Sequence, residues 1–192
     1  MGQLVVQQFV SADSFAASDR NEFDLFDHVE GDSSAFDRSN LEWLEGIGAI
    51  VLGANTYRMF ASYWPTPQAE HEVIAPRINS LAKYVFSRSL AAAPWGDDDS
   101  ATIASGDAPE TIRRLKGELH GDLILWGSLS LMHSLFRARA VDLVRLVVLP
   151  VAIGSGRGVF PPGEGTTALR LIATKTLDTF VTIDYALRGA AG

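Results

Sequence analysis

The chain has 192 residues, of which 47% are apolar and 20% charged, with a formal net charge of -7 and a pI near 5.0. This composition is typical of a soluble globular protein, and the length predicts one domain spanning residues 1–192. The acidic balance argues against a nucleic-acid surface, and without cysteine there is neither a disulfide scaffold nor a thiolate metal site. No apolar segment reaches membrane-spanning length, so we expect a cytoplasmic protein with no membrane partner.

The first part of the chain predicts alternating strands and helices. Leu4–Val10 is apolar and rich in β-branched residues, which predicts a central strand rather than a signal peptide. Apolar residues at helical spacing over Ser33–Gly46 predict a helix, and Ile47–Leu52 resumes as a strand, giving a βαβ unit with a right-handed crossover. A short helix over Thr56–Tyr63 then ends at Trp64–Pro67, which begins a loop that we expect to border a pocket.

The second part continues the pattern. Strands are predicted over Leu81–Ser87, Thr102–Ala104, Leu123–Trp126 and Val141–Leu149, and helices from Asp107 to Gly121 and from Ser128 to Arg139. Asp107 and Glu110 have the spacing of a capping box, and Gly121 is expected as the glycine that ends the helix. The three consecutive aspartates within Ala91–Ser100 indicate an exposed turn rather than a metal site.

Near the C-terminus, Pro150–Pro162 is a glycine-rich loop, and Leu169–Thr176 and Thr179–Leu187 predict an antiparallel hairpin that turns at Leu177 and Asp178. The run Gly154–Gly158 could suggest a dinucleotide fingerprint. Because Pro161 and Pro162 follow it instead of a helix, we interpret it as a loop near the site. The four histidines are scattered without metal-ligand spacing.

Three apolar strands end in a glycine or serine turn: Ile50–Thr56, Tyr84–Arg88 and Leu123–Ser128. If these strands are parallel neighbours, their carboxyl ends gather backbone N–H groups at one edge of the sheet, where a phosphorylated cofactor can bind. Each turn alone has a plainer interpretation, as a tight turn, a surface arginine or a helix cap. The combination is what indicates an anion-binding crevice.

Two further residues are candidates for a substrate pocket. Asp13, just past the first strand, is either a pocket carboxylate or the centre of an Asx turn. Trp64 is either a wall for a planar ring or part of the core. The residues alone leave both alternatives open.

The chain resembles the dihydrofolate reductase-like superfamily and is similar to the C-terminal reductase domain of bacterial riboflavin biosynthesis. The segments that carry the resemblance are Val10–Asp13, Leu52–Tyr57, Tyr63–Pro65, Val85–Arg88, Leu125–Leu131 and, most specifically, Ala140–Phe160. The resemblance implies an α/β fold with three α/β/α layers around a central mixed sheet of about eight strands, NADPH as cofactor and a homodimer.

The resemblance also implies roles for particular residues. Gly53, Asn55 and Thr56 would contact the pyrophosphate of NADPH, Ser87 and Arg88 the adenosine phosphate, and Gly127, Ser128 and Leu129 the other side of the pyrophosphate. Asp13 and Trp64 would be catalytic and would border the substrate together with Gly154 and Arg157. Because Ala54 stands where dihydrofolate reductases commonly carry an arginine, the preference for NADPH depends on Arg88 and on Arg58.

These observations support three hypotheses. The first is an NADPH-dependent reductase of a small heterocyclic substrate, pterin-like or pyrimidine-like, or of a carbonyl compound. The second is the riboflavin-pathway reduction of 5-amino-6-(5-phosphoribosylamino)uracil. The third is a non-catalytic nucleotide-binding module, which would bind NADPH without consuming it.

Overall fold

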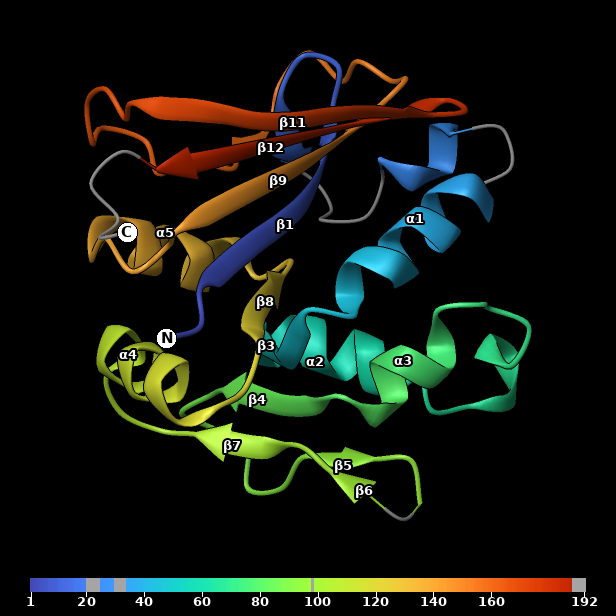
Figure 1. Ribbon diagram of the computed structural model, residues 1–192, viewed down its shortest axis with the longest axis vertical. Coiled ribbons are helices and arrows are strands. Elements are labelled where there is room, and N and C mark those ends of the chain that lie inside the picture. The colour runs from blue at the N-terminus through green and yellow to red at the C-terminus, as the bar shows by residue number, and fades with distance from the viewer. Residues whose placement is uncertain (20–24, 30–33, 98, 188–192) are drawn as a thin grey trace.

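The computed structural model describes residues 1–19, 25–29, 34–97 and 99–187. An eight-stranded sheet runs through it in the order β11-β12-β9-β1-β8-β3-β4-β7, as Figure 1 shows from top to bottom. The strands are β1 (Leu4–Ser11), β3 (Ile47–Gly53), β4 (Ala82–Phe86), β7 (Thr102–Ala104), β8 (Asp122–Trp126), β9 (Leu143–Leu149), β11 (Leu169–Leu177) and β12 (Phe180–Leu187). Two small ribbons pair β2 (Phe15–Ala17) with β10 (Arg157–Gly158) and β5 (Pro94–Trp95) with β6 (Asp99–Ser100).

The sheet is mixed, as predicted. Strands β9, β1, β8, β3, β4 and β7 are parallel, and β12 and β11 continue the sheet in an antiparallel hairpin. β1 is central, and β8, β3 and β4 are parallel neighbours, so the adjacency on which the predicted crevice depends is confirmed. The connection from β1 to β3 passes over one intervening strand, β8.

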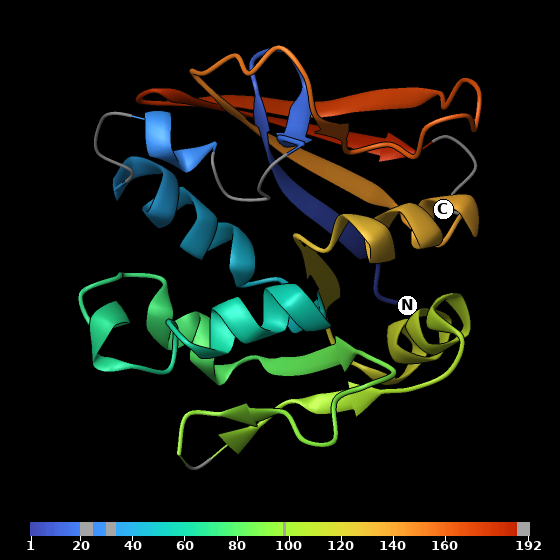
Figure 2. The ribbon, with the colours of Figure 1, turned by 180° about the vertical axis from the view of Figure 1, so that it is seen from behind.

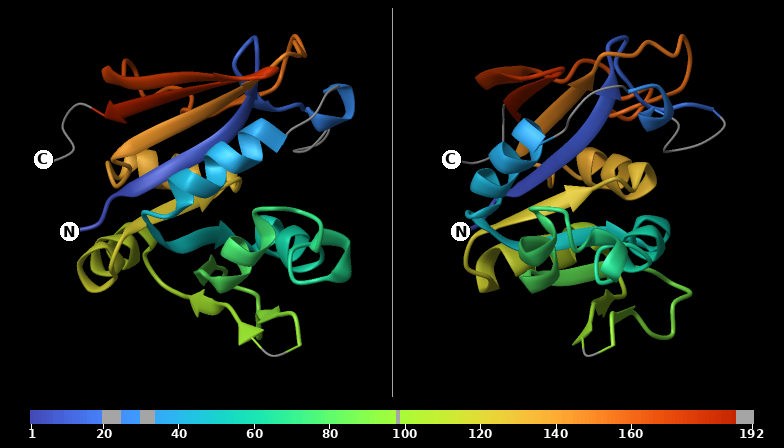
Figure 3. Two further views of the ribbon diagram at one scale, coloured as in Figure 1. Left: turned by 45° about the vertical axis from the view of Figure 1, so that its right-hand side comes forward. Right: turned by 90° about the vertical axis from the view of Figure 1, so that its right-hand side faces the viewer.

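Helices cover both faces of the sheet. They are α1 (Ser34–Leu44), α2 (Ala54–Ala61), α3 (Ala75–Ser80), α4 (Ala108–Glu118) and α5 (Leu129–Arg137), with 3-10 turns η1 (Phe26–His28) and η2 (Pro67–Ala69). In Figure 1, α4 and α5 lie on one side and α1, α2 and α3 on the other, and α1 runs close to β1 in both views of Figure 3. The three-layer α/β/α prediction is confirmed.

Apolar residues explain this layering. On the α4 and α5 face, Ile112 and Met132 pack into one buried cluster with Val6 of the central strand. On the opposite face, Leu44 and Ile78 join a second cluster with residues of β3 and β8. None of the described helices is both long and apolar enough to cross a membrane.

Several boundaries differ by one or two residues from the predicted ones; α2, for example, is predicted over Thr56–Tyr63 and runs over Ala54–Ala61. Two of the differences have a clear physical cause. Helix α4 ends at Glu118, because Leu119 adopts an extended backbone conformation (φ -91°, ψ 147°), although its N–H still bonds to the Leu115 carbonyl. Gly121 lies beyond that end at φ +89°, where a Cβ would approach the Gly46 carbonyl oxygen to 2.8 Å, so close backbone approach explains the glycine. The hairpin turns one residue later than predicted, because buried Leu177 pairs with Phe180.

Asp142, in the segment most specific to the resemblance, lies at the amino end of the parallel strands. One carboxylate oxygen accepts the Leu4 N–H at 2.6 Å and forms an ion pair with Lys116, which also donates to the Ala140 carbonyl at 2.7 Å. This carboxylate ties β1, α4 and β9 together at the edge opposite the strand ends that carry the predicted crevice. The position of Asp142 therefore indicates a structural role.

Candidate active site

A cavity of about 960 Å³ opens at the carboxyl ends of β3, β4, β7 and β8. We call it the strand-end cavity; its lining comes from the turn after β3, the residues after β4, the first turn of α4 and one side of α5. Six of the eight residues predicted to bind the cofactor line it, namely Gly53, Asn55, Thr56, Ser87, Arg88 and Ser128. The structure thus brings together three turns that are far apart in the sequence.

Ser128 joins two of these turns. Its Oγ accepts the Gly53 N–H at 2.7 Å and lies 2.7 Å from the Thr56 hydroxyl oxygen. Ser128 and the preceding Gly127 both have left-handed backbone conformations, at φ +58° and +56°. The Ser128 side chain therefore links β8 to α2 instead of capping α5, the role that the alternative sequence interpretation gave it.

The first N–H groups of α2 and α5 donate no hydrogen bond to a capping side chain. Both helices begin at the strand-end cavity, which is lined by residues from their first turns. Unpaired N–H groups and the positive end of the helix dipole favour an anionic ligand. The cavity therefore suits a pyrophosphate.

Two arginines contribute positive charge to the same cavity. The Arg137 Nε atom pairs with Glu164 at 3.0 Å, whereas no ion pair of Arg88 occurs within the described part of the chain. Arg58, the other predicted phosphate contact, donates to the Asn55 side-chain oxygen at 3.0 Å and is absent from the described lining of the cavity. Arg88 is consequently the cation best placed for a phosphate group.

A second cavity, of about 680 Å³, adjoins the first, and we call it the aromatic cavity. Its aromatic wall consists of Phe9, Phe26, Phe36, Phe60, Trp64, Trp126 and Phe180. Trp64 has edge contacts with Tyr63 and Phe60 at centroid distances of 5.2 and 6.0 Å, so it is both a cavity wall and part of the packed core. Buried Thr56 lines both cavities and marks where they meet.

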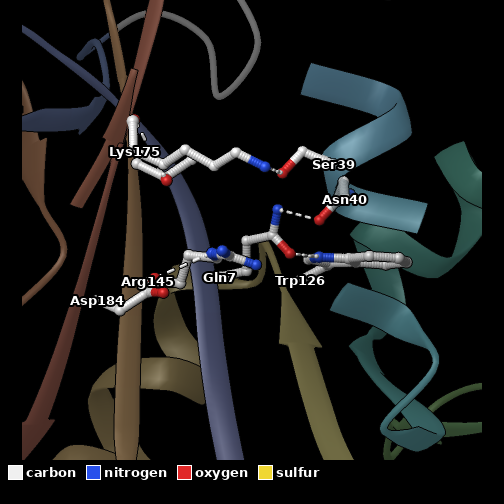
Figure 4. A network of polar contacts seen from close by, with 8 residues as sticks. Gln7, Ser39, Asn40, Trp126, Arg145, Lys175 and Asp184 are labelled. Atoms are coloured by element: carbon white, nitrogen blue, oxygen red, sulfur yellow. Dashed lines mark hydrogen bonds and ion pairs between the residues drawn. The ribbon is translucent and has the colours of Figure 1, made fainter. Parts of the chain in front are cut away.

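A buried relay of three side chains lies along the aromatic cavity, and Figure 4 shows Gln7 between the other two members. The Trp126 Nε1–H donates to Gln7 Oε1 at 3.0 Å, and Gln7 Nε2 donates to Asn40 Oδ1 at 3.1 Å. An indole N–H can only donate, so it fixes the orientation of both amides. The sequence reasoning missed this relay, although a glutamine inside an apolar strand was a signal for it.

Next to Gln7, on the neighbouring strand β9, the polar contacts continue with an ion pair that lies beneath α1. Gln7 pairs in register with Arg145, whose Nε lies 2.9 Å from Asp184 and whose guanidinium lies over the Trp43 ring at 4.3 Å. Burial lowers the pKa of Arg145 and raises that of Asp184, and the opposite charge of each partner counteracts the shift. Neither residue lines either cavity, so the ion pair supports the residues around the site from outside it.

The remaining predicted residues lie elsewhere. Asp13 accepts hydrogen bonds from the Ser11 hydroxyl at 2.5 Å and from the Gly154 N–H at 2.7 Å, and Arg157 belongs to β10, which pairs with β2. Figure 2 shows this part of the chain at one end of the sheet. Asp13, Gly154 and Arg157 are thus close to one another, but they are not among the described residues lining either cavity. Gly127 lines the aromatic cavity, and the Leu129 side chain is buried in the core.

Asp13 is expected to hold the 153–154 loop only while it is ionised. The Ser11 hydroxyl first, and then the Gly154 N–H, lower the pKa of this carboxyl below its ordinary value of 3.8. Because the folded pKa is depressed, the stabilisation is present above the unfolded value and is lost as the pH falls through the folded value. The NMR shift of the Gly154 amide should titrate with a midpoint below 3.8, and Asp13→Asn should abolish that titration; a midpoint at or above 3.8 would refute this role.

The sheet order, the flanking helices and the cavity at the strand ends define a dihydrofolate reductase-like fold. The structure aligns with Enterococcus faecalis dihydrofolate reductase complexed with NADP(H), with a TM-score of 0.60 and 12% identity over 97% of each chain. A protein from Shewanella sp. PV-4 named for riboflavin biosynthesis aligns with a TM-score of 0.76 and 19% identity, over 97% of this chain and 99% of that one.

Within that fold, the chain belongs to the family of RibD C-terminal domains, whose model matches residues 3–183. Acinetobacter baumannii RibD aligns with 97% of this chain at a TM-score of 0.69 and 14% identity, and the match spans 58% of the RibD chain. Two uncharacterized Bacillus subtilis proteins are 27% identical: YwjB over 92% of each chain and YyaP over 73% of each chain. The resemblance seen in the sequence is confirmed.

Proposed function

We propose that this protein is an NADPH-dependent reductase of a small heterocyclic substrate. The observation that carries the proposal is the junction of the two cavities at Thr56. A dinucleotide with its phosphates in the strand-end cavity can extend its nicotinamide ring past this residue into the aromatic cavity. There the ring would lie beside a planar ligand held by aromatic walls, which is the arrangement that hydride transfer needs.

The described residues fit NADPH. The uncapped starts of α2 and α5 suit its pyrophosphate, and Arg88 suits the 2′-phosphate that distinguishes NADPH from NADH. Bound NADPH would supply a hydride equivalent. The protein's contribution is to position donor and acceptor and to exclude water between aromatic side chains.

Family membership supports reduction as the reaction. One aligned structure is a Thermotoga maritima deaminase and 5-amino-6-(5-phosphoribosylamino)uracil reductase, with 14% identity, a TM-score of 0.65 and coverage of 56% of that chain. Another is a pyrimidine reductase-like protein from Corynebacterium diphtheriae, with a TM-score of 0.60. Reduction of the ribosylaminopyrimidine phosphate is therefore the second candidate function.

The test is consumption of NADPH, followed by its absorbance, with a panel of dihydropterins, aminopyrimidines and carbonyl compounds. The proposal predicts saturable, substrate-dependent oxidation with at least one heterocycle. NADPH binding without turnover across the whole panel would contradict the enzyme proposal and favour a nucleotide-binding module.

We also propose that the protein forms a homodimer through the β11 edge of the sheet. β11 is a nine-residue edge strand, and Leu171 and Ile172 on it are 56% and 48% exposed. A long apolar edge is a site for association, whereas the opposite edge strand, β7, has only three residues. Light scattering should give twice the chain mass, and Leu171→Glu should shift it to the monomer; a monomeric wild-type protein would contradict the proposal.

A further inference from the structure

The two adjoining cavities differ in charge. The strand-end cavity is lined by two arginines and one aspartate, Asp107, whose side chain caps α4. The aromatic cavity is lined by three acidic residues, Asp27, Asp37 and Glu72, and by no lysine or arginine within the described part of the chain. The aromatic cavity therefore disfavours an anionic ligand.

The buried relay determines which polar group Asn40 presents to a ligand in the aromatic cavity. Because Trp126 must donate, Gln7 offers its NH₂ group to Asn40, and Asn40 must answer with Oδ1. The Asn40 side chain is 6% exposed and lines the cavity, so its Nδ2 group is what it has left for a ligand. An NH₂ donor calls for an acceptor on the ligand, such as a ring carbonyl or an imine nitrogen.

We propose that the aromatic cavity takes a planar nitrogen heterocycle that carries no phosphate, with a ring carbonyl or imine nitrogen accepting a hydrogen bond from Asn40. This inference rests on the proposed function and names the substrate class for the same site. It separates the chain from a reductase that requires a phosphoribosyl substrate. A phosphate in this cavity would lie among three acidic lining residues, and no lysine or arginine of the described lining would compensate its charge.

The direct test compares ligands that differ only in a phosphate. Calorimetric titration of the full chain, with and without NADPH, would use 5-amino-6-ribosylaminouracil against its 5′-phosphate and 7,8-dihydroneopterin against its 3′-phosphate. We expect at least one unphosphorylated ligand to bind, and each one that binds to do so at least about tenfold more tightly than its phosphorylated counterpart. Equal or tighter binding of a phosphorylated member would overturn the proposal, and so would failure of both unphosphorylated ligands to bind.

This titration separates the inference from the proposed function. If NADPH neither binds nor is consumed while an unphosphorylated heterocycle still binds, the reductase proposal fails and the substrate class stands. If NADPH is consumed with the phosphorylated pyrimidine as the better substrate, the reductase proposal stands and this inference fails.

A second test reverses the polarity of the proposed donor. Asn40→Asp keeps an oxygen for Gln7 but places a second oxygen where the NH₂ group was, so binding of the unphosphorylated heterocycle should weaken about tenfold or more. Ser39→Ala is the matched control, because Ser39 lies on the same helix and accepts from Lys175 outside the cavity (Figure 4). The control should bind like the wild type. Unchanged affinity in a folded Asn40→Asp variant would show that Asn40 does not contact the ligand. If the variant does not fold, the titration of the wild-type protein with the paired ligands still tests the proposal.

Discussion

Replacing Arg88 by alanine is expected to weaken NADPH binding by about 10- to 100-fold and to change NADH binding by less than about twofold. Arg88 follows β4 and lines the strand-end cavity. Within the described residues, its guanidinium forms no ion pair with an acidic side chain. A guanidinium can form two charge-assisted hydrogen bonds with a phosphate, and NADH lacks the 2′-phosphate. The selective loss of NADPH affinity is therefore the signature of this contact.

The control for that experiment is Arg114→Ala. Arg114 lies on α4 and pairs with Glu118 on an exposed helix face, away from the lining of either cavity. The Arg114→Ala substitution removes the same charge from the protein as Arg88→Ala, so it corrects for a general electrostatic effect on a charged ligand. Equal losses of NADPH and NADH affinity in Arg88→Ala, or an equal NADPH loss in the control, would contradict the assignment.

Gly127→Ala is expected to reduce the free energy of unfolding by about 2 kcal/mol and NADPH affinity at least about tenfold. Gly127 has φ +56°, and a Cβ there would lie 3.0 Å from Thr56 Cγ2 and Oγ1. Relief of that contact must move Thr56, which is bonded to Ser128 and stands between the two cavities. One methyl group should thus affect both stability and the cofactor site.

Gly117→Ala provides the matched control. Gly117 lies in the last turn of α4, and a Cβ there would meet nothing within 4 Å. Alanine is the better helix former, so this variant should be about 0.5 kcal/mol more stable than the wild type and bind NADPH equally well. Chemical unfolding and cofactor titration of both variants test the pair. A Gly127→Ala protein with wild-type stability and NADPH affinity would show that the junction at Thr56 is not rigid.

The parts of the fold that could be predicted are those encoded locally. Each of the three strand ends combines a continuous apolar run with a glycine or serine turn, and parallel strands place such ends at one edge. The cavity that collects Gly53, Ser87 and Ser128 follows from that rule. The error at Gly121 arose because this glycine is required by close backbone approach and does not mark the end of α4. The error at Leu177 arose because core burial of Leu177 extends β11 by one residue.

The substrate side could not be predicted in the same way, because its contacts join distant positions. Gln7 is 33 residues from Asn40 and 119 from Trp126, and no local pattern relates them. At Asp13, by contrast, a local sequence pattern was present but did not predict the contacts of the side chain. Its place after a central strand indicated a pocket carboxylate, but its oxygens are engaged by Ser11 and by the 153–154 loop, 140 and 141 positions away.

The most direct measurement is a fluorescence titration of the wild-type protein with NADPH and NADH in parallel, following its four tryptophans. Trp64 and Trp126 line the aromatic cavity, so a dihydronicotinamide that reaches the junction at Thr56 should quench them by energy transfer. We expect saturable quenching by NADPH at micromolar concentration and at least about tenfold weaker binding of NADH. The absence of saturable quenching by either dinucleotide would contradict the claim that the strand-end cavity is a cofactor site.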